Sequence, residues 1–203
     1  SELSRSILQA EALRLRMPDR LPLAVLPRAY RQILYPFAYR EALLAESRRR
    51  RVDPYLLAAI VRAESRFDAE SLSPAAARGL AQLVYPTARR IAAHVGLPKL
   101  DIDDLYRPRL SIGLGAVYLS ELLRNFPGAP YAAVAAYNAG EPQALLWQHY
   151  CNSTEPEEYL TKVAFRETRS YLGRVLSNWE HYQALYRDQP AATPAAAVLP
   201  HLQ

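Results

Sequence analysis

The chain places one carboxylate, Glu64, on a helical face that is otherwise apolar. A helix is predicted over residues 54–66, because Asp53 is a favourable N-cap and Pro54 is favourable at the first helical position. Residues three, four and seven positions away share a helical face with Glu64, and here they are apolar: Leu57, Ile60 and Phe67. Glu64 is therefore expected on the apolar face, close to the C-terminal end of the helix.

This position has a chemical consequence for the Glu64 carboxyl. Burial disfavours its charged form, and so does the negative end of the helix dipole, so both effects raise the pKa. A carboxyl that stays protonated near neutral pH in an apolar cleft can act as a general acid. Two structural alternatives are a side chain that reaches solvent at the helix end and a buried ion pair with one of the many Arg residues.

Other common catalytic groups are poorly represented in the 203 residues. A single Cys, Cys151, excludes an internal disulfide and a Cys-based metal cluster. No Ser lies in a Gly-x-Ser-x-Gly motif, and no Gly-rich phosphate loop is present. The four His residues lack the spacing of metal ligands: His94, His149, His181 and His201. Neither a metal nor an organic cofactor is therefore expected.

The overall charge favours an anionic partner. The net charge is +5 and the isoelectric point is near 9.4, which suits nucleic acid, an acidic lipid surface or an anionic cell-wall polymer. The densest basic run, residues 48–51, is interpreted as the solvated C-terminal end of a helix. Zinc-finger, RRM and basic-zipper patterns are missing, so no nucleic acid is expected as a partner. The sequence predicts no transmembrane segment, and its first residues do not resemble a signal peptide.

Helical periodicity dominates the chain and no useful alternating strand pattern is present, so the predicted fold class is all-α. An amphipathic helix is expected over residues 1–16, with its apolar side formed by Ile7, Leu8, Leu13 and Leu15. A Pro-rich stretch over 17–29 should be extended, and loops are expected over 67–79 and 97–108. Further helices are predicted over 37–50, 54–66, 86–94, 109–125, 130–138, 157–163 and 167–186.

Four separated segments combine polar and aromatic residues of the kinds that line an enzyme cleft. They are residues 63–68 (AESRFD), 73–83 (SPAAARGLAQL), 135–140 (AAYNAG) and 165–171 (FRETRSY). In this order and spacing they resemble the soluble lytic transglycosylase (SLT) domain, a lysozyme-like module that cleaves peptidoglycan glycan strands. The resemblance covers about residues 35–185, and the middle run 112–119 fits it as well. It implies a lysozyme-like helical domain with a substrate cleft, preceded by a helical and extended leader.

The resemblance also implies roles for individual residues. Glu64 falls on the catalytic acid and base of the family. Four further residues fall on substrate-binding positions of the family: Ser73, Gln82, Tyr137 and Glu167. Their neighbours are candidate contacts to sugar subsites: Ala81, Tyr85, Asn138 and Tyr171. No metal ligand is implied.

This sequence departs from the family pattern in the second segment. The family has Met where Ala81 stands, and Met-Pro where Val84 and Tyr85 stand, with the Pro displaced to Pro86. Ala81 offers less apolar area to a sugar, and Tyr85 can restore some of it, so one sugar subsite is expected to differ. Because of this departure, a non-catalytic peptidoglycan-binding or scaffold domain stays an alternative.

Structural roles are open for the other site candidates. Tyr137 can be a core aromatic at a helix end that Gly140 terminates. Glu167 can be a first-turn acid favoured by the helix dipole, or the ion-pair partner of Arg78 or Arg169. Ser73 can be a turn residue, and Gln82 can lie on a helix surface.

The resemblance implies a peptidoglycan lytic transglycosylase. Such an enzyme breaks the β-1,4 bond between N-acetylmuramic acid and N-acetylglucosamine without water and leaves 1,6-anhydromuramyl ends. A lysozyme-like muramidase on the same fold is the hydrolytic alternative. The expected location is the periplasm or bacterial cell envelope, and the expected partner is the glycan strand; the sequence indicates no oligomeric state. We expect a leader over 1–34, a catalytic domain over 35–187 and a flexible Pro- and Ala-rich tail over 188–203.

Overall fold

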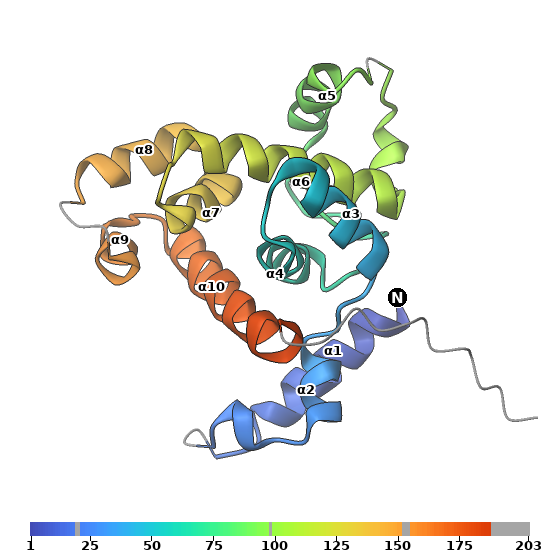
Figure 1. Ribbon diagram of the computed structural model, residues 1–203, viewed down its shortest axis with the longest axis vertical. Helices are drawn as coiled ribbons and strands as arrows, with labels where there is room; N and C mark the ends of the chain where they lie inside the picture. Colours follow the sequence, from blue (N-terminus) through green and yellow to red (C-terminus); the bar gives the residue numbers. More distant parts are fainter. Residues whose placement is uncertain (19–20, 98, 152–154, 188–203) are drawn as a thin grey trace, which may run out of the picture.

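The structure, a computed structural model, describes residues 1–18, 21–97, 99–151 and 155–187. Within these residues the chain is helical, which confirms the predicted all-α class (Figure 1). The tail predicted over 188–203 lies outside the described residues. In chain order the helices are α1 (Glu2–Arg14), α2 (Arg28–Leu34), α3 (Arg40–Arg50), α4 (Pro54–Ser65), α5 (Tyr85–His94), α6 (Pro108–Asn125), α7 (Pro130–Ala139), α8 (Glu141–His149), α9 (Pro156–Lys162) and α10 (Arg166–Tyr186).

Helix α4 lies at the centre of the domain, where Figure 1 shows it nearly end-on between α3, α6 and α10. It begins as predicted, because the Asp53 carboxylate accepts a hydrogen bond from the Tyr55 amide at 2.7 Å. A helix that is apolar on nearly all sides is stable only when neighbours cover it. Accordingly, most of α4 is buried: Leu56, Leu57, Ala58, Ala59, Ile60, Val61, Arg62 and Ser65.

Helix α7 is the second buried element, and it carries the residues 130–139 that were predicted as helix over 130–138. Its residues 131–137 are all buried, because α6, α8 and α10 pack around it. Five of these seven side chains are Ala or Val, which allows neighbouring helices to approach closely. The packing of α4 and α7 against the long helices α6 and α10 fixes the positions of the C-terminal ends of α4 and α7.

The leader differs from the prediction in two ways. The stretch predicted as extended over 17–29 contains a 3-10 helix, Leu23–Val25, and the first residues of α2. Here Pro22 and Pro27 serve as helix N-caps, a position that Pro tolerates because it needs no intrahelical N–H bond. The apolar side predicted for the first helix is also wrong in part, since α1 buries Ile7 while three others stay exposed: Leu8, Leu13 and Leu15.

Beyond the leader, where the 3-10 helix Leu23–Val25 and α2 were not predicted, two further helical elements escaped the prediction. Helix α8 (Glu141–His149) follows directly on Gly140, which ends α7 with a φ of +86°. Gly140 and Pro142 together indicate a loop, but Pro142 lies in the first turn of α8, where Pro is tolerated. The 3-10 helix Ile102–Tyr106 lies within the predicted loop 97–108 and is held by a capping box between Asp101 and Asp104.

One close backbone contact holds the loop after α4 against the 3-10 helix. Gly79 has a φ of +70°, and a Cβ at this position would overlap the carbonyl oxygen of Leu105. Only Gly fits here, because the conformation and the lack of space both exclude a side chain. The same loop pairs with itself through isolated bridges that join Arg78 to Leu72 and to Leu83.

We expect Gly79→Ala to lower the free energy of unfolding by about 2–4 kcal/mol, the sum of left-handed strain and overpacking against fixed backbone. Gly173→Ala is the matched control, because Gly173 lies inside α10 with no atom within 4 Å of an added Cβ. That variant should gain about 0.5–1 kcal/mol from helix propensity. Urea unfolding followed by circular dichroism measures both. Equal effects of the two substitutions would contradict the close contact at Leu105.

Candidate active site

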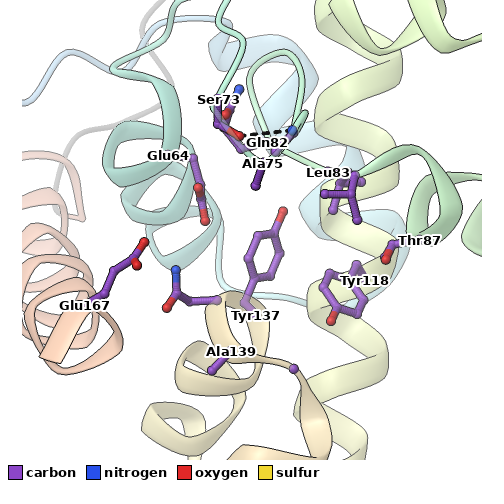
Figure 2. Close-up of a pocket in the computed structure, with 14 residues that line it drawn as sticks. Glu64, Ser73, Ala75, Gln82, Leu83, Thr87, Tyr118, Tyr137, Ala139 and Glu167 are labelled. Atoms are coloured by element: carbon purple, nitrogen blue, oxygen red, sulfur yellow. Dashed lines mark hydrogen bonds between the residues drawn. The ribbon is translucent and has the colours of Figure 1, made fainter. Parts of the chain in front are cut away.

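The site is a cavity of about 440 Å³ at the C-terminal end of α4 (Figure 2). Helices α4, α5, α6, α7 and α10 and the loop between α4 and α5 all contribute to its wall. Figure 2 shows Glu64 and Glu167 on one side, Thr87 and Tyr118 on the other, and Tyr137 between them. The lining residues are Glu64, Ser73, Ala75, Ala77, Gln82, Leu83, Val84, Thr87, Tyr118, Tyr137, Asn138, Ala139, Gly140 and Glu167.

Glu64 stands in the last turn of α4 with its carboxyl facing this cavity. Burial raises the pKa of the carboxyl from 4.5 to about 7. Three neighbours modify this effect, because Tyr171 and the positive charge of Arg174 lower the pKa while the carboxylate of Glu167 raises it slightly. The direction agrees with the prediction from the sequence.

The ion-pair alternative for Glu64 is not what the structure contains. The two Arg residues nearest in sequence, Arg62 and Arg66, bind the leader residue Glu11 at 2.9 and 3.1 Å. Among the described residues, Glu64 forms neither an ion pair within 4.0 Å nor a hydrogen bond within 3.5 Å. Its carboxyl is therefore shielded from bulk water and yet uncommitted, as a proton donor must be.

Behind the carboxyl, α10 presents a buried phenol. Tyr171 is 2% exposed, and its hydroxyl has no hydrogen-bond partner within the described part of the chain. It nevertheless lies close enough to the Glu64 carboxyl to lower the pKa of that group. A buried hydroxyl without a hydrogen-bond partner costs free energy. The position of the Tyr171 hydroxyl therefore favours the charged form of Glu64, whose carboxylate can accept a hydrogen bond from it. Tyr171 thus stands behind the acid and does not line the cavity.

The loop after α4 brings Ser73 and Gln82 to the cavity wall, above Glu64 in Figure 2. The Ser73 hydroxyl accepts a hydrogen bond from the Ala77 amide at 3.0 Å, which is the turn role considered as its structural alternative. Gln82 has a φ of +46°, and its side-chain nitrogen donates to the carbonyls of Ser71 and Gly79. Both residues therefore brace the loop, and both line the cavity as well.

Tyr137 and Asn138 reach the cavity from the C-terminal end of α7. The Tyr137 hydroxyl donates to the carbonyl of Ala81 at 2.9 Å, and burial raises the pKa of this phenol well above 10. The Asn138 side-chain oxygen accepts from the Thr168 hydroxyl at 2.7 Å, which joins α7 to α10. Tyr137 is therefore a buried core aromatic that also lines the cavity, and its role in substrate binding stays a prediction.

Glu167 lies in the first turn of α10 and is exposed on the cavity rim. The ion pairs considered for it are not formed, since Arg78 donates to the Ala76 carbonyl and Arg169 to the Val163 carbonyl. Among the described residues, two carboxyl groups thus line the cavity: that of Glu64 is shielded from water, and that of Glu167 is exposed.

Besides Tyr171, two candidate subsite residues do not line the cavity. Ala81 is fully buried beneath it, where its Cβ lies so close to Gly115 that a second Cβ there would stand 2.7 Å away. Tyr85 starts α5 and turns its hydroxyl to the Leu100 carbonyl at 2.7 Å, so it does not line the wall. The prediction that Ala81 and Tyr85 contact sugar is therefore corrected: the sequence change at Ala81 alters the packing under the site.

Three wall residues lie outside the four sequence segments and were not predicted as site residues: Val84, Thr87 and Tyr118. Val84 and Thr87 lie on either side of Tyr85 and Pro86 at the start of α5. Because Tyr85 was a candidate site residue, its neighbours could have been considered as well. Tyr118 lies in the run 112–119 that carried part of the resemblance. Its ring reaches the site by packing on Tyr137, with ring centroids 5.0 Å apart, and this contact joins two helices.

The described residues contain no group of three His, Cys, Asp or Glu side chains that could hold a metal ion. The same part of the chain has no helix that is both long and apolar enough to cross a membrane.

Comparison with known families assigns the chain to one of them. The model of the Transglycosylase SLT domain family matches residues 41–160. The chain belongs to this family. The matched range holds Glu64 and the wall residues from α4, α5, α6 and α7, whereas α10 with Glu167 lies beyond it. The family assignment given by the four sequence segments is therefore confirmed.

Similar proteins extend the comparison of this SLT domain. A Haemophilus influenzae protein, provisionally named soluble lytic murein transglycosylase, is 32% identical over 157 residues, which are 77% of this chain and 26% of that protein. Lytic transglycosylase Slt from Pseudomonas aeruginosa, solved as an inactive Glu-to-Gln variant, matches at 33% identity and a TM-score of 0.72, over 78% of this chain and 26% of the other. A 70-kDa soluble lytic transglycosylase in complex with bulgecin A has the same fold, at 23% identity and a TM-score of 0.79, over 95% of this chain and 30% of the other. The chain thus spans about a quarter of the length of these relatives.

The raised pKa of Glu64 predicts a pH-dependent effect of Glu64→Gln on stability. Above pH 7 the folded protein keeps a carboxylate in a shielded site, which costs up to about 3 kcal/mol relative to the unfolded chain. Below pH 4.5 the carboxyl is neutral in both states and this cost vanishes. The free energy of unfolding of Glu64→Gln should therefore exceed that of the wild type at pH 8, and the difference should shrink as the pH falls from 7 to 4.5. Urea unfolding at pH 4, 6 and 8 measures it.

Glu70→Gln is the control for this series, because Glu70 is an exposed carboxylate in the loop just after α4. Its difference from the wild type should stay nearly constant between pH 6 and pH 8. A Glu64→Gln difference that did not change with pH would contradict the raised pKa.

Proposed function

We propose that this SLT domain is a peptidoglycan lytic transglycosylase with Glu64 as both acid and base. It would cleave the β-1,4 bond between N-acetylmuramic acid and N-acetylglucosamine and leave a 1,6-anhydromuramyl end. The observation that carries the proposal is the shielded Glu64 carboxyl on the cavity wall, which has a pKa of about 7 and no ion-pair partner among the described residues. The names of the relatives, murein transglycosylases, support the same substrate.

The first step needs a proton on the leaving oxygen. At neutral pH a substantial fraction of Glu64 is protonated, and the carboxyl can donate to the glycosidic oxygen as the bond to the muramic C1 breaks. Positive charge then develops at C1, and the carbonyl oxygen of the substrate's own N-acetyl group can stabilise it. The proton passes from Glu64 to the departing N-acetylglucosamine hydroxyl, so the carboxyl becomes a carboxylate.

The second step uses that carboxylate as a base. It accepts the proton of the muramic 6-hydroxyl while the 6-oxygen bonds to C1, and Glu64 returns to its protonated state. No water is consumed, and no second carboxylate is required. Tyr171 and Arg174 suit this step, because both favour the charged form of Glu64 and so stabilise the intermediate protonation state.

The rest of the cavity would orient the sugars. Gln82 uses its amide nitrogen to brace the loop, which leaves its carbonyl oxygen available to accept a hydrogen bond from the substrate. Asn138 uses its oxygen for Thr168, which leaves its amide nitrogen available as a donor. Tyr137 and Tyr118 add an aromatic surface on which sugar rings can pack. We propose substrate binding for Ser73 and Glu167 as well, from their places on the wall.

A hydrolytic muramidase is the second candidate, and Glu167 is the observation that favours it. Its carboxylate lines the same cavity as Glu64 and lies on the same side in Figure 2, and a second carboxylate can activate water in glycosidases. The two reactions differ by one water in the product mass. The non-catalytic alternative loses its main support, since Ala81 lies beneath the cavity and not on its wall.

We further propose that the domain acts on peptidoglycan in the periplasm or cell envelope. The positive net charge of +5 would favour its approach to a strand that bears lactyl-peptide carboxylates. The division into a leader over 1–34 and a catalytic domain over 35–187 stays a prediction. The leader residue Ile7 packs into the same core as α4, and Glu11 binds α4 directly, so the leader is expected to support the active site.

The decisive experiment is product analysis on purified sacculi by mass spectrometry. Wild-type protein should release muropeptides with anhydro ends, and Glu64→Gln should lower their release by at least about 100-fold while the fold is kept, because the general acid is lost. Glu70→Gln serves as the control and should keep wild-type activity. Products heavier by one water would establish the muramidase, and full activity of Glu64→Gln would exclude Glu64 as the acid.

A further inference from the structure

A second cavity of about 400 Å³ adjoins the active-site cavity and shares Thr87 and Tyr118 with it. It lies between α5, α6 and the start of α8, on the side of the site that faces away from Glu64. We name it the α5–α6 trench, and the residues that give it its character are Arg90, Tyr118, Glu121, Arg124, Asn125 and Glu141. A strand bound across the active site can therefore continue into it.

Aromatic contacts connect the trench to the active site. The Tyr137 ring, next to Glu64 in the active-site cavity, packs on the Tyr118 ring at 5.0 Å between centroids. The Arg90 guanidinium in turn lies 6.0 Å from the centroid of the Tyr118 ring. The wall thus changes from aromatic to charged within the span of these three side chains.

Two of the four trench charges, Arg90 and Glu121, are already paired with each other. Glu121 accepts from Arg90 at 3.0 Å and contacts His94 at 3.2 Å, so these side chains join α5 to α6. The contacts of Glu121 with Arg90 and His94 are explained as a structural ion pair between two helices and do not indicate a ligand.

Two trench charges remain uncommitted. Arg124 uses one guanidinium nitrogen for the Ser120 hydroxyl at 2.9 Å and forms no ion pair within the described residues. Glu141 accepts one hydrogen bond from the Asn125 side chain at 3.1 Å, and within the same residues it also has no ion pair. Within the described part of the chain, the trench therefore offers one cation and one anion without an ion pair, beside a site that would hold neutral sugar rings.

We propose that the α5–α6 trench binds the stem peptide of a muramic residue outside the bond being cleaved, with Arg124 on a peptide carboxylate and Glu141 on the ammonium group of a diamino acid. The inference rests on the proposed function. Sugar hydroxyls do not require charged partners, whereas a stem peptide carries charges of both signs. Arg is suited to a carboxylate because its planar fork can donate two parallel hydrogen bonds.

The length of the trench fits such a peptide. From Tyr118 to Asn125 the helix α6 advances seven residues, which is about 10 Å at 1.5 Å per residue. Three residues of extended peptide also span about 10 Å. A stem peptide that leaves its sugar near Tyr118 would thus bring its second or third residue to Arg124 and Glu141.

The test is binding in the Glu64→Gln background, where turnover cannot interfere. Isothermal titration compares two probes: soluble glycan strands with stem peptides, and the same strands after an amidase has removed the peptides. Arg124→Gln should weaken the binding of peptide-bearing strands about 5–10-fold, the effect of losing a charge-assisted hydrogen bond, and should leave the binding of bare strands unchanged. Glu141→Gln should show the same selectivity for strands whose peptides contain a diamino acid.

Arg109→Gln is the matched control, because Arg109 lies on the same helix with 88% of its side chain exposed and outside the trench. It should change neither affinity. The proposal is overturned if Arg124→Gln weakens both probes equally or neither of them, and circular dichroism of each variant reports on folding. A wild-type protein that released no anhydro products would refute the proposed activity, while the binding series would still decide the role of the trench.

Discussion

The arrangement of this domain depends on one constraint, the shielding of the Glu64 carboxyl at the end of a buried helix. Helix α4 is surrounded by α3, α6 and α10, so its last turn can open only toward the cavity. Shielding from water raises the pKa of Glu64 to about 7, which lets one group hold a proton and later accept one at neutral pH. A carboxylate in bulk water would be ionised almost completely at that pH and could not serve as the donor.

The pKa of Glu64 stays raised because Arg62 and Arg66, the arginines nearest to it in sequence, form ion pairs with Glu11 instead. Arg62 is buried behind α4, where it donates to the Leu34 carbonyl, to Asn178 and to Glu11 and stacks on the Tyr35 ring. Glu11 thus connects the leader helix to the back of the helix that carries the acid. The neighbours that α10 supplies to Glu64 are of another kind, since Tyr171 and Arg174 stabilise the carboxylate without forming an ion pair with it. Burial raises the pKa of Glu64, and Tyr171 and Arg174 lower it. The result, about 7, lies above the usual range of a carboxyl but low enough for the group to ionise near neutral pH.

The surface that continues from the acid has two parts with different chemistry. Near Glu64 the wall consists of tyrosines, amides and small side chains, which suit neutral sugar rings. Beyond Tyr118 it becomes ionic, and there Arg124 and Glu141 lack charged partners among the described residues. A polymer whose backbone is neutral and whose branches are charged matches this division. The active-site cavity and the trench can therefore contribute to affinity separately, one through the glycan and the other through the peptide.

The sequence alone determined the helical class, the limits of α4, α6 and α7 and the raised pKa of Glu64, because capping residues and apolar periodicity act within a few residues of each other. It also determined the family, because four local motifs kept their order. What only the tertiary structure decided are contacts between distant segments. Ala81 looked like a sugar contact, but packing of the loop on α6 buries it. Tyr118 had no assigned role in the sequence, and only the packing of α6 on α7 brings its ring to Tyr137. Helix α8 was not predicted, because Gly140 and Pro142 indicate a loop unless a helix begins at Glu141. Such contacts depend on how helices pack, and that information is spread over the whole chain.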